Sequence, residues 1–173
     1  MIMFRDKSSR DKAFRAIVQQ FQRPVYFYVR RMVLDHDDAN DVTQNVFIKA
    51  WKGLDNFRSD AKISTWLYRI ATNESITFLN KQKKIMGVPL DQVEHSLGEK
   101  LHADVHYNGD EIQRKLQAAI ATLPEKQKAV FVMKYYEEKK YDEISEITDT
   151  SVGALKASYH HAVTKIEKFL KGN

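Results

Sequence analysis

Residues 56–84 constrain the fold more than any other part of this chain, because they carry a long amphipathic pattern with helical spacing. Ser64 is a suitable N-cap, and Gly87 and Pro89 follow the far end, so the sequence predicts one helix over residues 65–84. Four apolar residues fall on one side of this helix and should face a core: Leu67, Ile70, Ala71 and Phe78.

A second side of the same predicted helix is polar and includes one large aromatic residue. An indole, small hydrogen-bonding side chains and a cation along one groove suit unpaired bases and their phosphates. The alternative interpretation is a core tryptophan beside a solvated polar face. Glu74 falls within the apolar side, where the periodicity gives no reason for a carboxylate. The polar side consists of Trp66, Asn73, Thr77, Asn80 and Lys84, with Arg69 at its edge.

Two further helices are predicted before this segment. Residues 12–34 have apolar residues at helical spacing, and Pro24 in their middle is expected to kink this helix or split it in two. Three aspartates open the next helix, since carboxylates favour the positive end of the helix dipole, and Gly53 ends it. The inward side of this second helix is formed by Val42, Val46, Phe47 and Ala50.

The C-terminal part has the spacing of a helix-turn-helix. Helices are expected over residues 111–122 and, after a break at Pro124, to about residue 136. No segment alternates in the manner of a strand, so the predicted fold class is all-α. A short helix, a turn and a longer helix follow over residues 142–148, 149–151 and 152–170.

Charge divides the chain into three parts. Residues 1–84 carry a net charge of +7, residues 85–110 one of −4 and residues 111–173 one of +2. The acidic middle part has weak periodicity, and we expect it to be a flexible linker between two small helical domains. A basic first domain indicates a nucleic acid or an acidic protein surface as its partner.

Composition argues against several classes of function. The chain has no cysteine, which excludes disulfides, thiolate metal sites and a cysteine nucleophile. It has no apolar run typical of a signal peptide or a membrane span, so we expect a cytoplasmic protein without membrane insertion. No phosphate-binding loop or nucleophile–base pair is visible, so we expect no cofactor, no small-molecule substrate and no enzymatic reaction.

Two clusters of side chains invite a metal interpretation. An acidic group near residue 38 would suit a hard cation and a nuclease, but helix capping accounts for most of it. Three histidines of the linker include an i,i+4 pair, yet they have no evident carboxylate or thiolate partner, and we expect no metal site. The acidic group consists of Asp35, Asp37, Asp38 and Asp41, and the histidines are His95, His102 and His106.

Three motifs in one order give the chain a family resemblance over residues 14–170. The chain resembles the extracytoplasmic-function (ECF) σ factors, which are small promoter-recognition subunits of bacterial RNA polymerase. The resemblance to their region 2 rests on DDANDVTQNVFIKAWKGLDNF and WLYRIATN. The resemblance to region 4 rests on LPEKQKAVFVMKYYEEKKYDEISEITDTSVGALKASYHHA. It implies a region 2 domain at residues 1–84, a linker at 85–110 and a region 4 domain at 111–173.

The resemblance also implies two contacts with core RNA polymerase. The helix over residues 38–51 would dock on the β′ clamp helices, and an apolar surface of the C-terminal domain on the β flap. The polar side of that helix agrees with this role, because a solvated docking surface needs complementary charge. A cognate anti-σ factor is the implied regulator. The implied polymerase-binding residues are Asp38, Asp41, Gln44, Asn45, Phe47 and Trp51.

Promoter DNA is the other implied partner. The loop before residue 63 resembles the family's loop for a flipped base of the −10 element, and the recognition helix would read the −35 element as duplex. Thr77 and Asn80 stand where the family usually has Asp and Arg, and Ser158 and His161 stand where it usually has Arg. The implied −10 residues are Asn56, Phe57, Arg58, Ser59, Lys62, Trp66, Arg69, Asn73, Thr77, Asn80 and Lys84. The implied −35 residues are Ser151, Lys156, Ala157, His160 and His161.

The expected function is therefore that of an alternative σ factor, which binds core polymerase and directs promoter-specific transcription initiation. Three other interpretations remain open at this point: a stand-alone helix-turn-helix repressor, a metal-dependent nuclease, and a helical scaffold without a nucleic acid partner.

Overall fold

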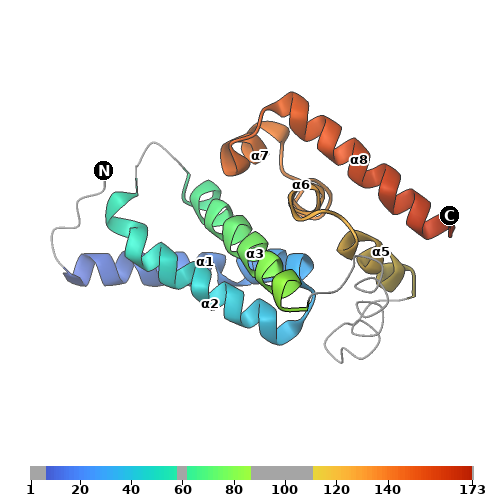
Figure 1. Cartoon of the computed structure of the whole chain (residues 1–173). Coiled ribbons are helices and arrows are strands. Elements are labelled where there is room, and N and C mark those ends of the chain that lie inside the picture. Colours follow the sequence, from blue (N-terminus) through green and yellow to red (C-terminus); the bar gives the residue numbers. More distant parts are fainter. Residues whose placement is uncertain (1–6, 58–61, 87–110, 173) are drawn as a thin grey trace.

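The computed structural model describes residues 7–57, 62–86 and 111–172, and every regular element in these ranges is a helix (Figure 1). The all-α prediction is thus confirmed. The linker expected at 85–110 lies, from residue 87 onward, outside the described residues. The first elements are α1 (Lys7–Val33), α2 (His36–Gly53), the 3-10 turn η1 (Leu54–Asn56) and α3 (Ile63–Met86). They are followed by α5 (Glu111–Ala121), α6 (Glu125–Tyr135), α7 (Tyr141–Thr148) and α8 (Val152–Lys171).

Helix α1 runs through Pro24 without a break, so of the two expected effects of this proline, a kink or a split, the split does not occur. Proline removes one N–H from the helical ladder and leaves the carbonyl four residues earlier without its partner. Pro24 is exposed, and on the outer side of a helix water can take the place of that N–H. The buried residues Val25, Tyr28 and Val29 hold the other side of the helix in the core.

The starts of α2 and α3 show one correct and one wrong prediction. Asp35 caps α2, and its Oδ1 accepts from the backbone N–H groups of Asp37 at 2.9 Å and Asp38 at 3.0 Å. Ser64, in contrast, is not the N-cap of α3. The helix begins at Ile63, two residues before the predicted start at residue 65, and the N–H of Trp66 already donates to the carbonyl of Lys62 at 3.1 Å.

The helix-turn-helix lies where the sequence predicts it. Ile144 and Ile147 of α7 and Leu155 of α8 are buried together in the core. Asp149 ends α7 in the left-handed conformation, with φ of 54°, which short polar residues adopt more readily than bulky ones. Ser151 caps α8, because its Oγ accepts from the N–H of Ala154 at 3.3 Å.

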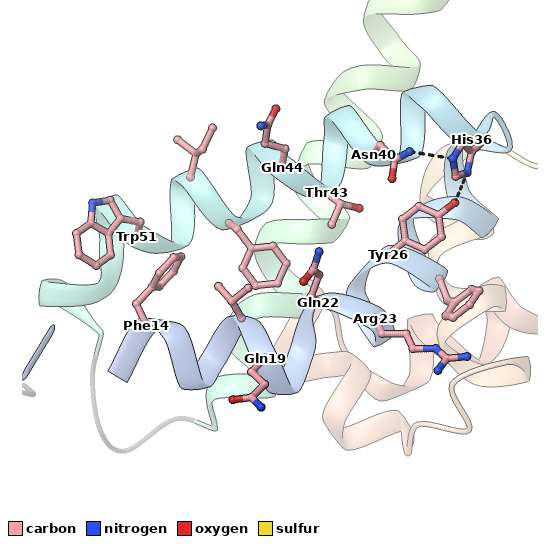
Figure 2. A pocket seen from close by; sticks show the side chains of 14 residues that line it. Phe14, Gln19, Gln22, Arg23, Tyr26, His36, Asn40, Thr43, Gln44 and Trp51 are labelled. Atoms are coloured by element: carbon pink, nitrogen blue, oxygen red, sulfur yellow. Dashed lines mark hydrogen bonds between the residues drawn. The ribbon is translucent and has the colours of Figure 1, made fainter. Parts of the chain in front are cut away.

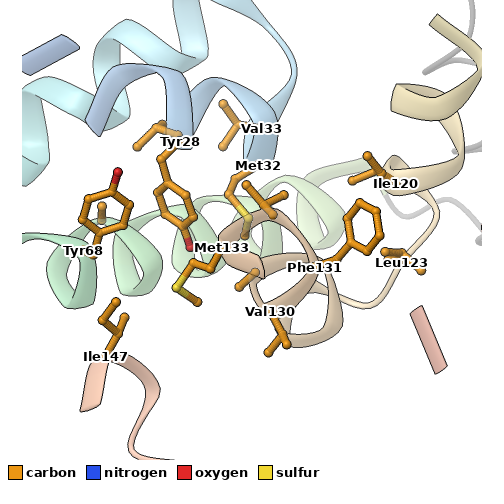
Figure 3. Close-up of a cluster of buried hydrophobic side chains, with 14 of the residues drawn as sticks. Tyr28, Met32, Val33, Tyr68, Ile120, Leu123, Val130, Phe131, Met133 and Ile147 are labelled. Carbon is orange, nitrogen blue, oxygen red and sulfur yellow. The ribbon is translucent and has the colours of Figure 1, made fainter. Parts of the chain in front are cut away.

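Helices α1–α3 form one unit and α5–α8 form another, and the two units share one hydrophobic cluster (Figure 3). Helix α6 contacts both α1 and α3, and α7 packs on α3. Fully buried side chains from the two units meet there, among them Tyr28 and Met32 of α1 and Met133 of α6. The sequence predicts two units but not this packing of one on the other.

Candidate functional surfaces

The outer side of α2 presents three of the six predicted polymerase-binding residues to solvent. Asp41, Gln44 and Asn45 are exposed, whereas Asp38 is half-buried. The Oδ2 of Asp38 accepts from the Nε2 of Gln82 at 3.0 Å, so this carboxylate also ties the end of α3 to the start of α2. Asp38 therefore has a partner within the protein, whereas Asp41, Gln44 and Asn45 form a solvated polar strip.

The last two predicted residues on α2 lie in an aromatic cluster at its C-terminal end. Trp51 packs edge-on against Phe14 of α1, with ring centroids 5.0 Å apart, and Phe14 in turn packs against Phe47. The guanidinium of Arg10 lies 3.9 Å from the centre of the Trp51 ring, and its Nη2 donates to the Trp51 carbonyl at 2.7 Å. Both aromatic residues of α2 are thus half-buried and held by α1.

A groove of about 840 Å³ runs between α1 and α2 beside these residues (Figure 2). Its far wall is built by Tyr26, His36 and Asn40, since the Tyr26 hydroxyl lies 2.7 Å from His36 Nδ1 and the Asn40 amide 3.1 Å from His36 Nε2. Phe27 and Ile48 line it and are 42% and 44% exposed. Sequence reasoning missed this groove because half of its lining comes from α1. The signal available in the sequence was Phe27, an aromatic residue away from the apolar side of that predicted helix.

The polar side of α3 stays open over most of its length. Asn73, Thr77, Asn80 and Lys84 are exposed on one side of the helix. Trp66 is half-buried, so it belongs both to this surface and to the small core cluster beneath it. One part of the indole therefore lies in the core, and the other part is available at the polar surface of α3.

The loop before α3 differs from the prediction at one residue. Phe57, predicted to stack on a base, is only 4% exposed, and its ring lies 5.1 Å from that of Trp66. Burial against the tryptophan removes Phe57 from the open surface, while Asn56 and Lys62 on either side are exposed. The predicted residues Arg58 and Ser59 lie outside the described residues.

The recognition helix α8 exposes the predicted −35 residues. Lys156, Ala157, His160 and His161 are all exposed. Ser151 is exposed too, but its hydroxyl has the structural task of capping α8. A second cap lies at the start of α7, where the Oε2 of Glu143 accepts from the N–H of Lys140 at 3.0 Å. This hydrogen bond lowers the pKa of Glu143 and keeps it anionic.

The acidic group near residue 38 is divided among separate tasks. Asp35 caps α2 and Asp38 bonds Gln82, while Asp41 is exposed. Within residues 7–57, 62–86 and 111–172, no three His, Asp or Glu side chains are grouped so as to hold a metal ion. The linker residues His95, His102 and His106 lie outside these ranges. Among the described helices, none is both long and apolar enough to cross a membrane.

Comparison with known proteins agrees with this arrangement. The family model of Sigma-70 region 2 matches residues 17–85, and that of Sigma-70 region 4 matches residues 113–166. The ECF RNA polymerase sigma factor SigW of Bacillus subtilis is 31% identical over 174 residues, which cover 95% of this chain and 92% of that protein. The ECF RNA polymerase sigma-E factor of Escherichia coli K12 is 30% identical over 164 residues, 90% of this chain and 85% of that protein.

Solved structures share the fold. The sigma factor RpoE in complex with the anti-sigma factor NepR from Bartonella quintana superposes with a TM-score of 0.73 at 20% identity, over 92% of this chain and 98% of that one. CnrH in complex with the cytosolic domain of CnrY superposes with a TM-score of 0.68 at 19% identity, over 94% of this chain and 90% of that one.

Two Sigma-70 regions in the order 2 then 4, on an all-α chain, define a σ factor. The chain belongs to the ECF σ factors. It is an alternative σ factor that directs transcription initiation, and the repressor interpretation is not favoured.

Proposed function

We propose that this σ factor binds core RNA polymerase through the outer side of α2 and the neighbouring groove. The solvated strip of Asp41, Gln44 and Asn45 would meet the β′ clamp helices, and the groove between α1 and α2 would take apolar side chains of the same partner. The strip is polar, and Phe27 and Ile48 beside it are partly exposed. This composition is typical of an interface with a polar rim and an apolar centre. The C-terminal unit would contact the β flap.

Promoter recognition is divided between the two units in this proposal. The unit at residues 1–84 would hold the unpaired −10 strand with Asn56, Lys62 and the polar side of α3, on which Trp66 offers a stacking surface. The unit at residues 111–173 would read the −35 duplex with the exposed side of α8. Residues 85–110 would connect the two. Ser151 would contribute through its cap, which fixes the start of the recognition helix.

In this scheme the chain forms and breaks no covalent bond, and it needs neither a cofactor nor a small-molecule substrate. The free energy of strand capture would shift the equilibrium of promoter opening, since binding of one state of the DNA favours that state. The expected location is the cytoplasm. An anti-σ factor is the expected regulator, in keeping with the anti-sigma factor NepR that is named as the partner of one solved relative.

The observation that carries the polymerase contact is the solvated strip on α2, and its test is a double substitution. Asp41→Ala with Gln44→Ala should weaken binding to core enzyme, because losing one partner of a charged contact that becomes buried on binding costs about 2–5 kcal/mol. Glu167→Ala with Gln20→Ala is the matched control, since these exposed residues of α8 and α1 give the same change in charge. Co-purification with core enzyme equal to that of the control would refute the assignment of α2.

A further inference from the structure

The two units are joined by a carboxylate as well as by the shared apolar cluster. Glu137 follows α6, and its side chain is 14% exposed. Its Oε1 accepts from Nη1 of Arg31 on α1 at 3.0 Å, and its Oε2 accepts from the hydroxyl of Tyr68 on α3 at 2.6 Å. A mostly buried carboxylate is stable only while such partners remain. Both partners belong to the other unit, so separation of the units removes them together.

Further polar contacts surround this carboxylate. The guanidinium of Arg31 lies 4.4 Å from the centre of the Tyr136 ring, and the ammonium of Lys139 lies 3.9 Å from that of Tyr68. The Nε2 of Gln117 donates to the Arg31 carbonyl at 3.3 Å. Burial raises the pKa of Tyr68, and its hydrogen bond to Glu137 raises it further, so the phenol stays a donor. These groups form one network across the boundary between the units.

A second set of contacts involves the surface that we assign to the −10 strand. Arg69, at the edge of the polar side of α3, donates to the backbone carbonyl of Glu146 on α7. The Nζ of Lys62 lies 4.0 Å from Oε1 of Glu143 on α7. Figure 1 shows α7 beside the N-terminal half of α3, where these contacts fall. Two cations proposed for DNA phosphates are thus engaged by the helix-turn-helix, and an anionic carboxylate stands beside them.

We propose that this packing is an autoinhibitory contact: the unit α5–α8 closes on α1–α3 through Glu137 and withholds Lys62 and Arg69 from the DNA strand. The inhibitory part of this inference rests on the proposed function of α3. In the closed form, a strand approaching the exposed residues Asn73 and Asn80 finds both cations occupied. The apparent strand affinity is then reduced by the fraction of molecules in the open form.

Distances between the units test the closure itself, without DNA or polymerase. The chain has no cysteine, so Gln20→Cys on α1 and Glu167→Cys on α8 give two unique sites for spin labels in the full-length protein. Double electron–electron resonance should show one narrow distance distribution as the main population. Glu137→Gln removes the charge that Arg31 meets and should add a longer, broader population. Arg31→Gln should do the same from the other unit, while Glu138→Gln, an exposed neighbour with the same charge change, should not.

Strand binding tests the inhibition. The probe is a fluorescein-labelled 20-nucleotide single strand of mixed sequence. Glu137→Gln should bind it about tenfold more tightly than the wild type, as expected if the wild type is open in about a tenth of molecules. Adding Lys62→Ala and Arg69→Ala to Glu137→Gln should abolish the gain. Circular dichroism on each variant establishes that helix content is retained.

The outcomes separate the parts of the inference. Distance distributions of Glu137→Gln and Arg31→Gln that match the wild type overturn the closure. Longer distances with unchanged strand affinity overturn the inhibitory role. Promoter opening by Asn73→Ala with Thr77→Ala, measured in the complex with polymerase, tests the proposed function of α3 separately, so a failure of that function is recognised independently of both results.

Discussion

Lys49 of α2 and Glu74 of α3 form an ion pair, with Nζ 2.5 Å from Oε1. This contact explains why a carboxylate interrupts the apolar side of α3. The Glu74 side chain is 15% exposed and the Lys49 side chain 59% exposed, so the pair lies at the rim of the α2–α3 contact. Its lysine end is solvated and its carboxylate end is mostly covered.

A double-mutant cycle measures this pair. Glu74→Ala should lower the free energy of unfolding by about 1 kcal/mol, and the coupling with Lys49→Ala should be about 0.5 kcal/mol, because exposed lysine loses little when left alone. Chemical denaturation of both single variants and the double variant gives the coupling. A coupling energy of zero would mean that the two side chains contribute independently.

Lys128 of α6 predicts a dependence of stability on pH. It is 4% exposed, and burial lowers its pKa to about 8, with Glu125 opposing the shift. Unfolded lysine has a pKa near 10.5, so between about pH 8 and 10.5 the unfolded chain binds more protons. Stability from this group therefore rises with pH across that window, and below it the buried charge costs about 3 kcal/mol.

Lys128→Met should remove that cost. The variant should be more stable than the wild type at pH 7, and its advantage should shrink as the pH rises toward 10.5. The measurement is the difference in unfolding free energy between variant and wild type at each pH, which cancels titrations common to both. Lys126→Met, at an exposed site on the same helix, is the control. A constant difference across pH 7–10.5 would show that Lys128 keeps an ordinary pKa in the folded protein.

Ser151 allows a cap to be distinguished from a DNA contact. Ser151→Ala should destabilise α8 by about 1 kcal/mol, whereas Ser151→Asp should keep the cap, since aspartate caps as well as serine. If Ser151 also faces DNA phosphates, the aspartate should weaken duplex binding at full stability. Thermal unfolding and −35 duplex binding in the complex with polymerase give the two measurements. Unaltered duplex binding by Ser151→Asp would leave the residue with its capping role alone.

The exposed residues of α3 test strand capture more directly than the half-buried Trp66 does. Asn73→Ala with Thr77→Ala should reduce promoter opening about tenfold, since two hydrogen bonds contribute about 0.5–1.5 kcal/mol each. Stability should change little, because both side chains are exposed. A fluorescent base at the −10 element reports opening, with Gln20→Ala on α1 as control. Trp66→Ala should lower opening and stability together, because the indole is half-buried. Normal opening by the Asn73/Thr77 variant would remove this side of α3 from the DNA interface.

His161→Arg should tighten contact with the −35 element. His161 is exposed on the same helix as Lys156 and His160, and an arginine there adds a fixed charge and a fork of donors for phosphate. The salt dependence of duplex binding should steepen by about one phosphate contact. Glu167→Arg, which adds more charge on α8 outside the predicted −35 residues, is the control. A gain equal to that of the control would show that only net charge matters.

Local structure was predictable from the sequence because it depends on neighbouring residues. The spacing of apolar residues places α2, α3, α7 and α8, and Asp35 marks the start of α2. The start of α3 was misplaced because Ser64 is one of several residues able to cap, and the sequence does not mark that the backbone bond from Trp66 to Lys62 forms first. The effect of Pro24 was misjudged for a related reason, because the destabilisation of a helix by proline depends on whether the proline faces solvent.

The packing of the two units was not predictable, because it depends on pairs far apart in the chain. The hydroxyl of Tyr68 donates to the carboxylate of Glu137 at 2.6 Å, and Arg31 meets the same carboxylate across more than a hundred residues. No periodicity marks such partners. The exposed residues of the candidate surfaces were better predicted, because the side of a helix that faces solvent follows directly from the side that is buried.

The hydrophobic cluster that spans both units also determines how the chain melts. Val29 and Met32 of α1 lie in the same cluster as Val132 and Met133 of α6. Each unit alone would keep only part of this buried surface, and small domains have little stability to spare. Unfolding of one unit should therefore remove part of the packing of the other. A substitution in α6 that weakens the cluster should lower the melting temperature of α1–α3 as well as that of its own unit.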